Sequence, residues 1–334
     1  MAYVHLANAD GWFTVPSRER QFERTSALVR RSALILPVNV RRFVERAYTR
    51  GADAIVLDLE DSVPPSAKAA ARTLVRESIE LAGRGGADVQ VRINKPFELA
   101  VLDLDAAIWP GLSGIVFPKV ESAVEVQIVD CLIAERELAR GLPIGRIELS
   151  VLVESALGVQ HMAEIACASP RIVSLSLGAE DFARDIGVEP TPEGSEQAYG
   201  KGMVIVAARL AGVQPMGLTS TLANFTDLEG LARSAQLAAS QGFKGASCIH
   251  PAQVPILNAA YSPDPAALEY ARRVISVYEE TEAAGRASVS LDGTMIDIPI
   301  VERARTLVRR AEAISAFEAK KQAALAAAGS ADAP

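Results

Sequence analysis

Short runs of β-branched and aliphatic residues recur along the chain, and each is followed by a longer stretch with the periodicity of an amphipathic helix. This alternation is typical of βα units that build a parallel sheet. We predict eight strands, at Ala33–Pro37, Ala54–Asp58, Val89–Ile93, Gly114–Pro118, Leu149–Val153, Ile172–Leu177, Pro215–Leu218 and Ala246–Ile249. The helices between and after them are expected at Val40–Arg50, Ser66–Ala82, Glu98–Ile108, Ala123–Ala139, Ala156–Ala168, Tyr199–Ala211, Asp227–Gln241 and Pro251–Ala259.

The number of βα units favours one of two architectures. Eight units close a barrel, whereas the alternative is an open, doubly wound sheet. Open sheets that bind dinucleotides carry a glycine-rich turn after the first strand, and Pro37, Val38 and Asn39 stand there instead. We therefore predict an α/β protein, a (β/α)8 TIM barrel with a C-terminal helical or lid extension.

The pattern changes outside these units and suggests where the domains end. After Tyr261 we expect a helix at Pro265–Ala284, a short apolar stretch at Val289–Ile298, and a charged helix from Ile300 to about Leu325. The domains are then an N-terminal extension (1–28), the barrel (29–262), a C-terminal lid or oligomerisation segment (263–326) and a disordered tail (327–334).

Composition narrows the class of function. The chain is 49% hydrophobic and 22% charged, which suits a globular protein with a sizeable core. Its 34 Lys and Arg against 41 Asp and Glu argue against binding to duplex nucleic acid, which needs a basic surface. We expect no membrane partner and a cytoplasmic protein, because no signal peptide or spanning segment is recognisable. The widely spaced Cys131, Cys167 and Cys248 suggest neither a disulfide framework nor a zinc site.

Ionic residues gather where the predicted strands end. In a barrel, catalytic groups come from the carboxyl ends of the strands, and we call that end the mouth. Carboxylates and cations together suit a divalent metal ion and an anionic substrate, because oxygen ligands hold Mg2+ while arginine neutralises a carboxylate. The ionic residues expected at the mouth are Asp58, Glu60, Asp61, Arg92, Lys119, Glu154, Glu180 and Asp181.

Glu154 and Asp181 are the strongest candidates for metal ligands. They follow the adjacent strands five and six, where two carboxylates could share one Mg2+ and leave positions for water and substrate oxygens. The alternative is that either acid caps the following helix. That role is common for Asp but less suited to Glu154, because Glu is not a favoured N-cap residue.

The cations and the other acids at the mouth have two possible roles each. Arg92 either pairs with a barrel carboxylate or clamps a substrate carboxylate through two hydrogen bonds, and both can hold at once. Lys119 fits a salt bridge and a substrate contact equally well. Of Asp58, Glu60 and Asp61, at most two can point into the mouth together, since side chains alternate along an extended strand. The remaining acid would pair with Lys68 or Arg72.

Histidine and lysine chemistry is less well supported. Of the three histidines, only His250 lies at a predicted strand end, and the sequence contains no HExxH motif. The residues that a zinc site or a Ser-His-Asp triad would need are therefore scarce. His250 is equally consistent with a packed, hydrogen-bonded side chain. A Schiff-base aldolase is disfavoured because Lys119 is surrounded by acids in the expected mouth.

Several longer motifs appear together between about residues 30 and 312. They are RRSALILP at Arg30–Pro37, DLEDSVPP at Asp58–Pro65, VRIN at Val91–Asn94, PKVES at Pro118–Ser122, VESALGV at Val153–Val159, SPR at Ser169–Arg171, GAEDFARDIG at Gly178–Gly187, IHPAQV at Ile249–Val254 and DGTMIDIP at Asp292–Pro299. In combination they resemble the citrate lyase β-subunit family of the HpcH/HpaI aldolase/citrate lyase superfamily, which includes malyl-CoA, citramalyl-CoA and citryl-CoA lyases.

The resemblance implies a carbon–carbon lyase that binds Mg2+ through Glu154 and Asp181, with Arg92 gripping the carboxylate of a hydroxy or keto acid. It also implies that Asp297 reaches into the site of a neighbouring subunit, so that the protein forms a homotrimer or homohexamer. Asp61, Glu60 and Asp297 are then the candidates for moving protons, with Arg92 as a further catalytic residue. The residues expected to contact the substrate or its thioester carrier are Arg31, Arg92, Lys119, Ala179 and Glu180. For Asp297, the alternative role is an N-cap of the helix that begins near Pro299.

The expected reaction is cleavage or formation of a carbon–carbon bond in a hydroxyacyl-CoA thioester such as malyl-, citramalyl- or citryl-CoA. The sequence departs from the family pattern at Gly217, where many members carry Asp, at Lys201, near a frequent Arg, and across Gly217–Phe225. These departures flank the expected thioester entrance, so the acyl group and the use of CoA stay open. The alternatives are a metal-dependent aldolase on free hydroxy or keto acids and a non-catalytic family member.

Overall fold

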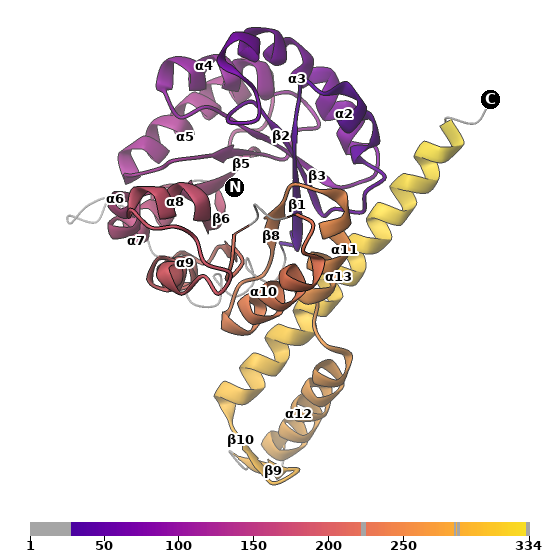
Figure 1. Ribbon diagram of the computed structural model, residues 1–334. Helices are drawn as coiled ribbons and strands as arrows, with labels where there is room; N and C mark the ends of the chain where they lie inside the picture. The colour runs from indigo at the N-terminus through magenta and orange to yellow at the C-terminus, as the bar shows by residue number, and fades with distance from the viewer. Residues whose placement is uncertain (1–27, 222–224, 284, 286–287, 332–334) are drawn as a thin grey trace.

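Eight parallel strands form a barrel surrounded by helices (Figure 1). The structure is a computed structural model that describes residues 28–221, 225–283, 285 and 288–331. The strands are β1 (Ser32–Pro37), β2 (Ala54–Asp58), β3 (Asp88–Arg92), β4 (Gly114–Phe117), β5 (Glu148–Val153), β6 (Ile172–Leu177), β7 (Gln214–Met216) and β8 (Ala246–Cys248). Their order is β7-β6-β5-β4-β3-β2-β1-β8, with β8 paired to β1. The predicted TIM barrel is therefore confirmed.

The barrel closes between β7 and β8 through residues at the ends of these short strands. The backbone N–H of Gly217 donates to the carbonyl of Gly245 at 2.9 Å, and that of Lys244 donates to the carbonyl of Pro215 at 3.0 Å. Inside the barrel, Gln90 and Ser174 both donate to the hydroxyl of Ser150, at 2.7 and 2.8 Å. Polar side chains from β3, β5 and β6 are thus hydrogen-bonded to one another, as buried polar groups require.

The surrounding helices follow the predicted order with two differences. They are α2 (Arg41–Ala47), α3 (Lys68–Gly83), α4 (Phe97–Ala107), α5 (Ala123–Ala139), α6 (Ala156–Gln160), α7 (Met162–Ala166), α8 (Ala179–Asp185), α9 (Ala198–Ala211), α10 (Leu228–Gln241) and α11 (Val254–Ala260). The helix predicted at Ala156–Ala168 is divided at His161, whose ring Nδ1 lies 2.8 Å from the carbonyl of Glu121. The short helix α8, which begins directly after β6, was not predicted.

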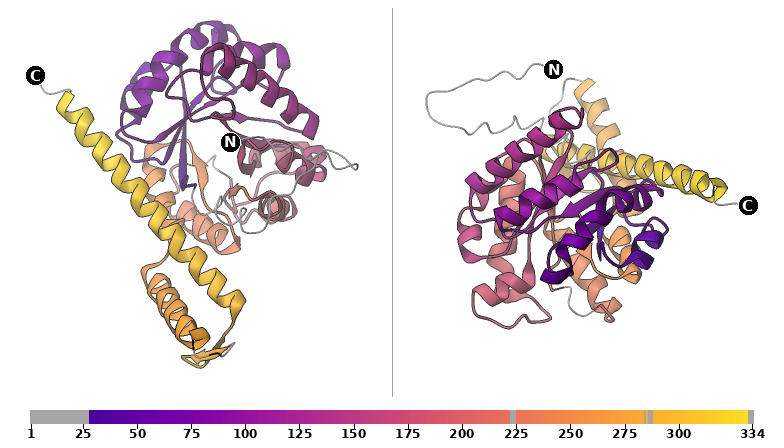
Figure 2. Two further views of the ribbon diagram at one scale, coloured as in Figure 1. Left: turned by 180° about the vertical axis from the view of Figure 1, so that it is seen from behind. Right: turned by 90° about the horizontal axis from the view of Figure 1, so that it is seen from above.

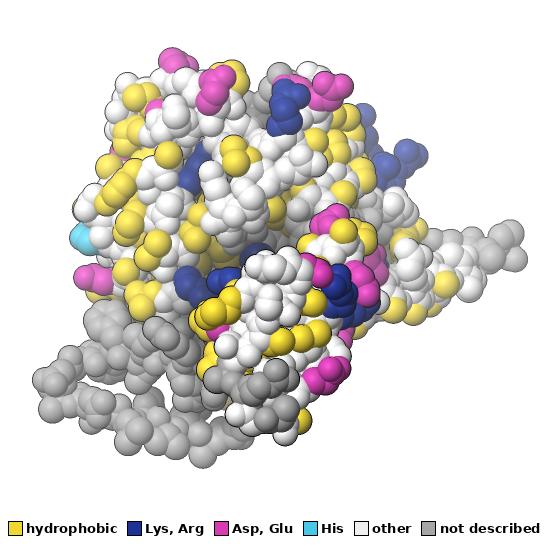
Figure 3. All heavy atoms as spheres, turned by 90° about the horizontal axis from the view of Figure 1, so that it is seen from below, with side chains coloured by type: hydrophobic (Ala, Val, Ile, Leu, Met, Phe, Trp, Pro, Cys, Tyr) yellow, Lys and Arg dark blue, Asp and Glu magenta, His cyan; other side chains and the backbone are white. Residues whose placement is uncertain are grey.

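The C-terminal part of the chain projects from the barrel (Figure 1). It contains α12 (Pro265–Ala283), an antiparallel hairpin of β9 (Val289–Leu291) and β10 (Thr294–Ile296), and α13 (Ile298–Ala331). We call α12, the hairpin and residues 298–308 the C-terminal lobe. Its own small core is separate from that of the barrel and is formed by Ala271, Val274, Tyr278, Ile296, Val301 and Ala304. Figure 3 looks onto the end of this lobe, where hydrophobic side chains lie beside charged ones.

The last helix is longer than predicted. α13 continues through Ala331, although the helix was expected to end near Leu325 and the following residues to fray. Alanine, the strongest helix former, makes up much of this added stretch. The predicted N-terminal extension lies outside the described residues, apart from Leu28. Among the helices that the structure describes, none has the length and apolarity needed to span a membrane.

α13 crosses the barrel at the amino-terminal ends of its strands, as the left view of Figure 2 shows from behind. Arg310 donates to the carbonyl of Lys244, just before β8, and Lys321 donates to Asp53, just before β2, at 2.7 Å. Glu318 pairs with Arg31, just before β1. All these contacts lie at the end opposite to the mouth. The C-terminal extension is helical as expected, but α13 does not form a lid over the mouth of its own barrel.

Candidate functional site

Arg92 and Asp58 form the buried base of the mouth. Asp58 ends β2 and Arg92 ends the neighbouring β3, so their side chains meet across paired positions. The guanidinium donates from Nε and Nη2 to the two oxygens of Asp58, both at 2.7 Å, while Nη1 lies 3.0 Å from Glu60. Burial alone would raise the pKa of Asp58, but the hydrogen bonds and charge of Arg92 outweigh burial and hold this pKa below its usual value. Arg92 is therefore a fixed cation beneath the mouth.

Lys119 connects the acids of the β2–α3 loop to the next strand. Its Nζ lies 2.5 Å from Glu60 and 3.2 Å from Asp61. Glu60 is thus shared by Arg92 and Lys119, whereas the side chain of Asp61 is 58% exposed. Burial raises the pKa of Glu60, and the two cations offset this only in part. Arg92 and Lys119 therefore each pair with a barrel carboxylate, as predicted. Glu60, which both cations contact, binds a proton more readily than an ordinary carboxylate.

Glu154 lies in the mouth immediately after β5. Its Oε2 accepts the backbone N–H of Lys119 at 2.8 Å, and none of the described residues donates a hydrogen bond to Oε1. Burial raises the pKa of Glu154, and the carboxylates of Glu60 and Asp181 raise it further, to about 8. Negative charge at this point is therefore poorly compensated by the protein itself.

Asp181 lies in the first turn of α8, directly beyond β6. It acts on the pKa of Glu154 through its charge, so the two carboxylates are electrostatic neighbours. Asp181 forms an ion pair with Arg184, at 2.8 Å, and the Arg184 side chain is 78% exposed. In the same turn Glu180 is exposed and Ala179 half-buried. The structure thus brings Glu154 and Asp181 to one edge of the mouth, and Ala179 and Glu180 beside them.

These residues fit a magnesium ion. A carboxylate whose pKa is raised by two carboxylate neighbours gains from a divalent cation, which replaces repulsion by attraction. Within the described residues no three Asp, Glu, His or Cys side chains gather as a metal cage. Mg2+ needs no such cage, since it commonly binds one or two carboxylates and keeps water or substrate oxygens as its other ligands. Glu154 and Asp181 are the residues that would hold it.

Arg31 lies at the other end of the barrel. It precedes β1 and is held by Asp53, with Nε to Oδ2 at 2.7 Å, and by Glu318 of α13. This placement differs from the expectation that Arg31 contacts the substrate, and the physical reason is the direction of the strand: a residue before a strand lies opposite to the mouth. Arg31 fastens α13 to the barrel instead.

Asp297 lies in the C-terminal lobe, at the turn between β10 and α13. Its carbonyl accepts the N–H groups of Ile300 and Val301, both at 3.1 Å, and its carboxylate lies 3.4 Å from the N–H of Ile300. Within one chain, therefore, Asp297 takes the predicted alternative role at the start of α13. His250 likewise caps a turn, with Nδ1 accepting the N–H of Ala252 at 3.2 Å, and stacks on Phe225.

Two residues that support the site were not singled out from the sequence. Asp58 was treated only as one of three acids, yet it fixes the orientation of Arg92. Gly178 was not considered, although a Cβ there would lie 2.3 Å from Oε1 of Glu154. Its position at the start of GAEDFARDIG, between a strand and the acid Asp181, was the available signal.

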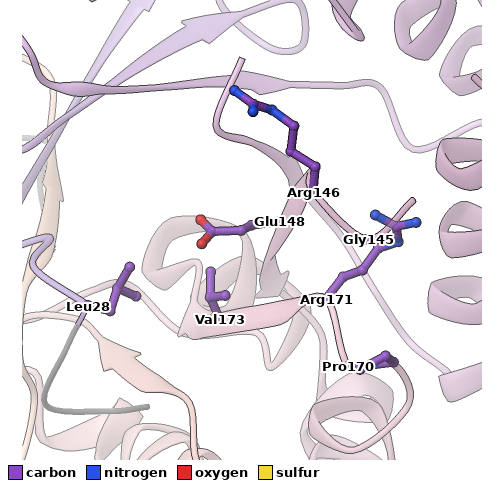
Figure 4. Close-up of a pocket in the computed structure, with 7 residues that line it drawn as sticks. All are labelled: Leu28, Gly145, Arg146, Glu148, Pro170, Arg171 and Val173. Carbon is purple, nitrogen blue, oxygen red and sulfur yellow. The ribbon is translucent and has the colours of Figure 1, made fainter. Parts of the chain in front are cut away.

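A pocket of about 370 Å3 lies away from this cluster, at the amino-terminal ends of β5 and β6 (Figure 4). Its lining includes Glu148, which pairs with Arg30 at 2.5 Å, and Arg171, which is held by Asp130 and Glu137. The charged groups in its wall are thus largely engaged in ion pairs. The reacting groups of a TIM barrel lie at the opposite end, so we assign the candidate site to the mouth.

Comparison with known proteins identifies the family of the chain. Residues 31–251 match the family model described as HpcH/HpaI aldolase/citrate lyase. The chain is 36% identical over 288 residues to citrate lyase subunit beta of Leuconostoc mesenteroides subsp. cremoris, covering 85% of this chain and 94% of that protein. It is 34% identical over 293 residues to L-malyl-CoA/beta-methylmalyl-CoA lyase of Cereibacter sphaeroides (strain ATCC 17025 / ATH 2.4.3), covering 81% and 91%.

Solved structures give the same result. Protein CitE from Mycobacterium tuberculosis, in complex with magnesium, acetoacetate and coenzyme A, superposes with a TM-score of 0.67 at 27% identity, over 86% of this chain and 99% of that chain. The citrate lyase beta subunit from M. tuberculosis complexed with oxaloacetate and magnesium has a TM-score of 0.56 at 28% identity, over 71% and 99%. By these matches the chain belongs to the HpcH/HpaI aldolase/citrate lyase family and is, as its motifs predicted, a carbon–carbon lyase.

Proposed function

We propose that the chain is a Mg2+-dependent lyase that cleaves or forms a carbon–carbon bond in a hydroxyacyl-CoA thioester such as malyl-, citramalyl- or citryl-CoA. The observation that carries this proposal is the pairing of Glu154 with Asp181 beside the fixed cation Arg92. The relatives that act on malyl-CoA, and the M. tuberculosis protein seen with magnesium and coenzyme A, support the same substrate class.

The mouth contains the groups that a retro-aldol or retro-Claisen cleavage needs. Glu154 and Asp181 hold Mg2+, which when bound polarises the hydroxyl and carboxylate oxygens of the substrate. Asp58 occupies Nε and Nη2 of Arg92, and Glu60 lies 3.0 Å from Nη1. These contacts fix the direction of the guanidinium, whose N–H groups that face neither acid are the ones offered to the substrate carboxylate.

Proton transfer requires a group that takes a proton from the substrate hydroxyl and one that returns a proton to the enolate. Glu60 suits the first role because its raised pKa makes it a stronger base than an ordinary carboxylate. Lys119 keeps Glu60 and Asp61 together in the loop after β2. Asp297 is the candidate for the second role, supplied by a neighbouring subunit.

The C-terminal lobe supports a homotrimer or homohexamer in which each lobe completes another subunit's site. Asp297 stands between Met295 and Ile298, whose side chains are 63% and 59% exposed. Apolar side chains exposed on both sides of a carboxylate suit a contact with another protein surface. α13 is anchored at the end of its own barrel opposite to the mouth, and this supports a role for Asp297 in the site of a partner.

A substrate screen tests the proposal. Malyl-, citramalyl- and citryl-CoA and the corresponding free acids are incubated with protein and Mg2+, and released glyoxylate, pyruvate or oxaloacetate is measured. We expect release from at least one thioester and none with the Glu154→Gln variant. Turnover of a free acid without CoA would favour the aldolase alternative. Mg2+ binding without turnover of any compound would favour a non-catalytic family member.

A further inference from the structure

The backbone of Lys119 has a conformation that only a minority of non-glycine residues adopt. Its φ is +55°, in the left-handed region, and Asp292 is the only other described non-glycine residue with positive φ. This conformation directs the N–H of Lys119 at Oε2 of Glu154, at 2.8 Å, while the next N–H, that of Val120, returns to the sheet and donates to Leu152. Residues in the left-handed region persist where their surroundings hold them, and they often occur at functional sites.

Lys95 provides a contact that holds this backbone. It follows β3, and its Nζ donates to the carbonyl of Lys119 at 2.8 Å. The same Nζ lies 2.6 Å from Oε1 of Glu125, in the first turn of α5. The other carboxylate oxygen of Glu125 accepts the N–H of Glu121 at 2.8 Å. Lys95 therefore clamps the loop after β4 at two points, one on each side of residues 120–124.

We propose that Lys95 is a positioning residue, which acts through the backbone of Lys119 to fix the carboxylate of Glu154 for Mg2+. This inference rests on the proposed role of Glu154 as a metal ligand. Among the described residues, Lys95 bonds to the carbonyl of Lys119 and to Glu125 and not to the acids of the mouth. Its effect on Glu154 passes through the carbonyl and the N–H of Lys119. Groups that orient a metal ligand in this way commonly change metal affinity by tenfold or more.

The charge of Lys95 gives the test its direction. Replacing Lys95 by Met removes a positive charge close to the metal site, which on electrostatic grounds alone strengthens Mg2+ binding. The positioning role predicts the reverse, because the loop after β4 loses its clamp and Glu154 its fixed donor. The sign of the change therefore separates the two effects.

The experiment is calorimetric titration of the full-length protein with MgCl2. We expect Lys95→Met to bind Mg2+ about tenfold more weakly than the parent with unchanged stoichiometry. Lys95→Arg, which keeps a cation able to bond both oxygens, should stay within about twofold. Lys320→Met at the opposite end of the barrel, where Nζ lies 4.0 Å from Asp88, is the matched control and should bind as the parent does. Thermal melting of each variant checks that the fold is retained.

A second variant tests whether the effect passes through the backbone of residue 119. Glycine adopts positive φ without strain, so Lys119→Gly removes the backbone strain that the clamp opposes. We expect Lys95→Met to weaken Mg2+ binding clearly in the parent but by less than about twofold in the Lys119→Gly background. Equal losses in both backgrounds would overturn the proposed route through Lys119.

The remaining outcomes separate this inference from the proposed function. Unchanged or tighter Mg2+ binding in Lys95→Met, with normal binding by the parent, overturns the positioning role and leaves the proposed function intact. Absence of Mg2+ binding by the parent overturns both. The expected loss of affinity in a protein that cleaves none of the thioesters supports the positioning role and counts against the proposed function.

Discussion

The α-carbon of Gly178 lies against the carboxylate of Glu154, so closely that a Cβ at residue 178 would come within 2.3 Å of Oε1 and 2.6 Å of Cγ. Gly178 begins the turn from β6 into α8, while Glu154 ends the neighbouring strand β5. The absence of a side chain at one strand end therefore creates the space that the metal-ligand candidate of the next strand occupies.

Gly178→Ala should consequently displace Glu154 without altering any ionisable group. We expect Mg2+ binding to weaken about tenfold or more, because the carboxylate must shift from its position beside residue 178. The measurement is calorimetric titration. Gly202→Ala on α9 is the control, since a Cβ there meets nothing within 4 Å, and it should leave the affinity unchanged. If Gly178→Ala binds Mg2+ normally, the carboxylate of Glu154 is not a ligand in the position described here.

Glu154→Gln and Asp181→Asn should each remove Mg2+ binding and activity while the fold is retained. Both side chains lie at the mouth and not in the core of the barrel. In the metal-free protein Glu154→Gln should melt no earlier than the parent, because burial disfavours the ionised carboxylate that the amide replaces. Titration with MgCl2 measures the loss of metal binding, and thermal melting measures the retained stability. If either variant still binds Mg2+ as the parent does, Glu154 and Asp181 are not the ligand pair.

Arg92→Lys keeps the charge but cannot bond both oxygens of Asp58 and still present a fixed fork to the substrate. We expect glyoxylate or pyruvate to bind more weakly in the presence of Mg2+, by about 1.5–3 kcal/mol, the range for hydrogen bonds to charged groups. Arg41→Lys, in an exposed pair with Glu45, serves as the control. If Arg92→Lys binds the ligand as tightly as the parent does, Arg92 does not hold the substrate carboxylate and serves only as the ion-pair partner of Asp58.

Asp297 can be tested by mixing subunits. Asp297→Asn and Glu154→Gln proteins should each be inactive alone if the lobe of one chain completes the site of another. After dissociation and reassembly together, a fraction of the sites receives one intact residue of each kind, so partial activity should return. A role limited to capping α13 within one chain gives no recovery at any mixing ratio, which would contradict the shared site.

Lys201 gives the protein a stability that depends on pH. Its Nζ is buried and donates to the carbonyl of Thr219 at 2.6 Å. Burial lowers its pKa to about 8, and the charge of Glu196 offsets this only in part. Below pH 8 the folded protein must bury the ammonium ion, and this cost is relieved as pH rises from about 8 towards the ordinary lysine value near 10.5.

Lys201→Met should therefore be more stable than the parent at pH 7, by roughly 1–3 kcal/mol, and the advantage should shrink by pH 10. Denaturant unfolding at the two pH values measures the difference. Lys320→Met, at a side chain 58% exposed, should stay within about 0.5 kcal/mol of the parent at both. A benefit of Lys201→Met that is equal at pH 7 and pH 10 would exclude the ionisation of Lys201 as its cause.

The barrel and most of its mouth follow from local sequence. Apolar runs predict the strands because a strand covered by helices on the outside and filled inside is mostly apolar on both faces, and the acids follow at the strand ends. Strand direction would also have placed Arg31 at the amino-terminal end, since it stands before β1. The sequence-based prediction assigned Arg31 to the substrate instead, because Arg31 belongs to the motif RRSALILP.

Other features depend on contacts that no local pattern carries. The positive φ of Lys119 has no signal in the sequence, because a lysine after Pro118 is equally compatible with extended backbone. The clamp by Lys95 joins two loops that become neighbours only when β3 and β4 pair. The division of one predicted helix at His161 arises from the hydrogen bond to Glu121, which is 40 residues earlier in the chain. The proposed catalytic role of Asp297 depends on another copy of the chain.

The anchoring of α13 at the far end of the barrel has a consequence for how such a protein can change. At 34 residues, α13 is about 50 Å long, and its attachments through Arg310, Glu318 and Lys321 involve none of the loops at the mouth. Substitutions in those loops, such as residues 217–221 after β7, can alter which acyl group is accepted without loosening the support of the lobe. Substrate preference can thus diverge while the attachment of the C-terminal lobe is inherited unaltered.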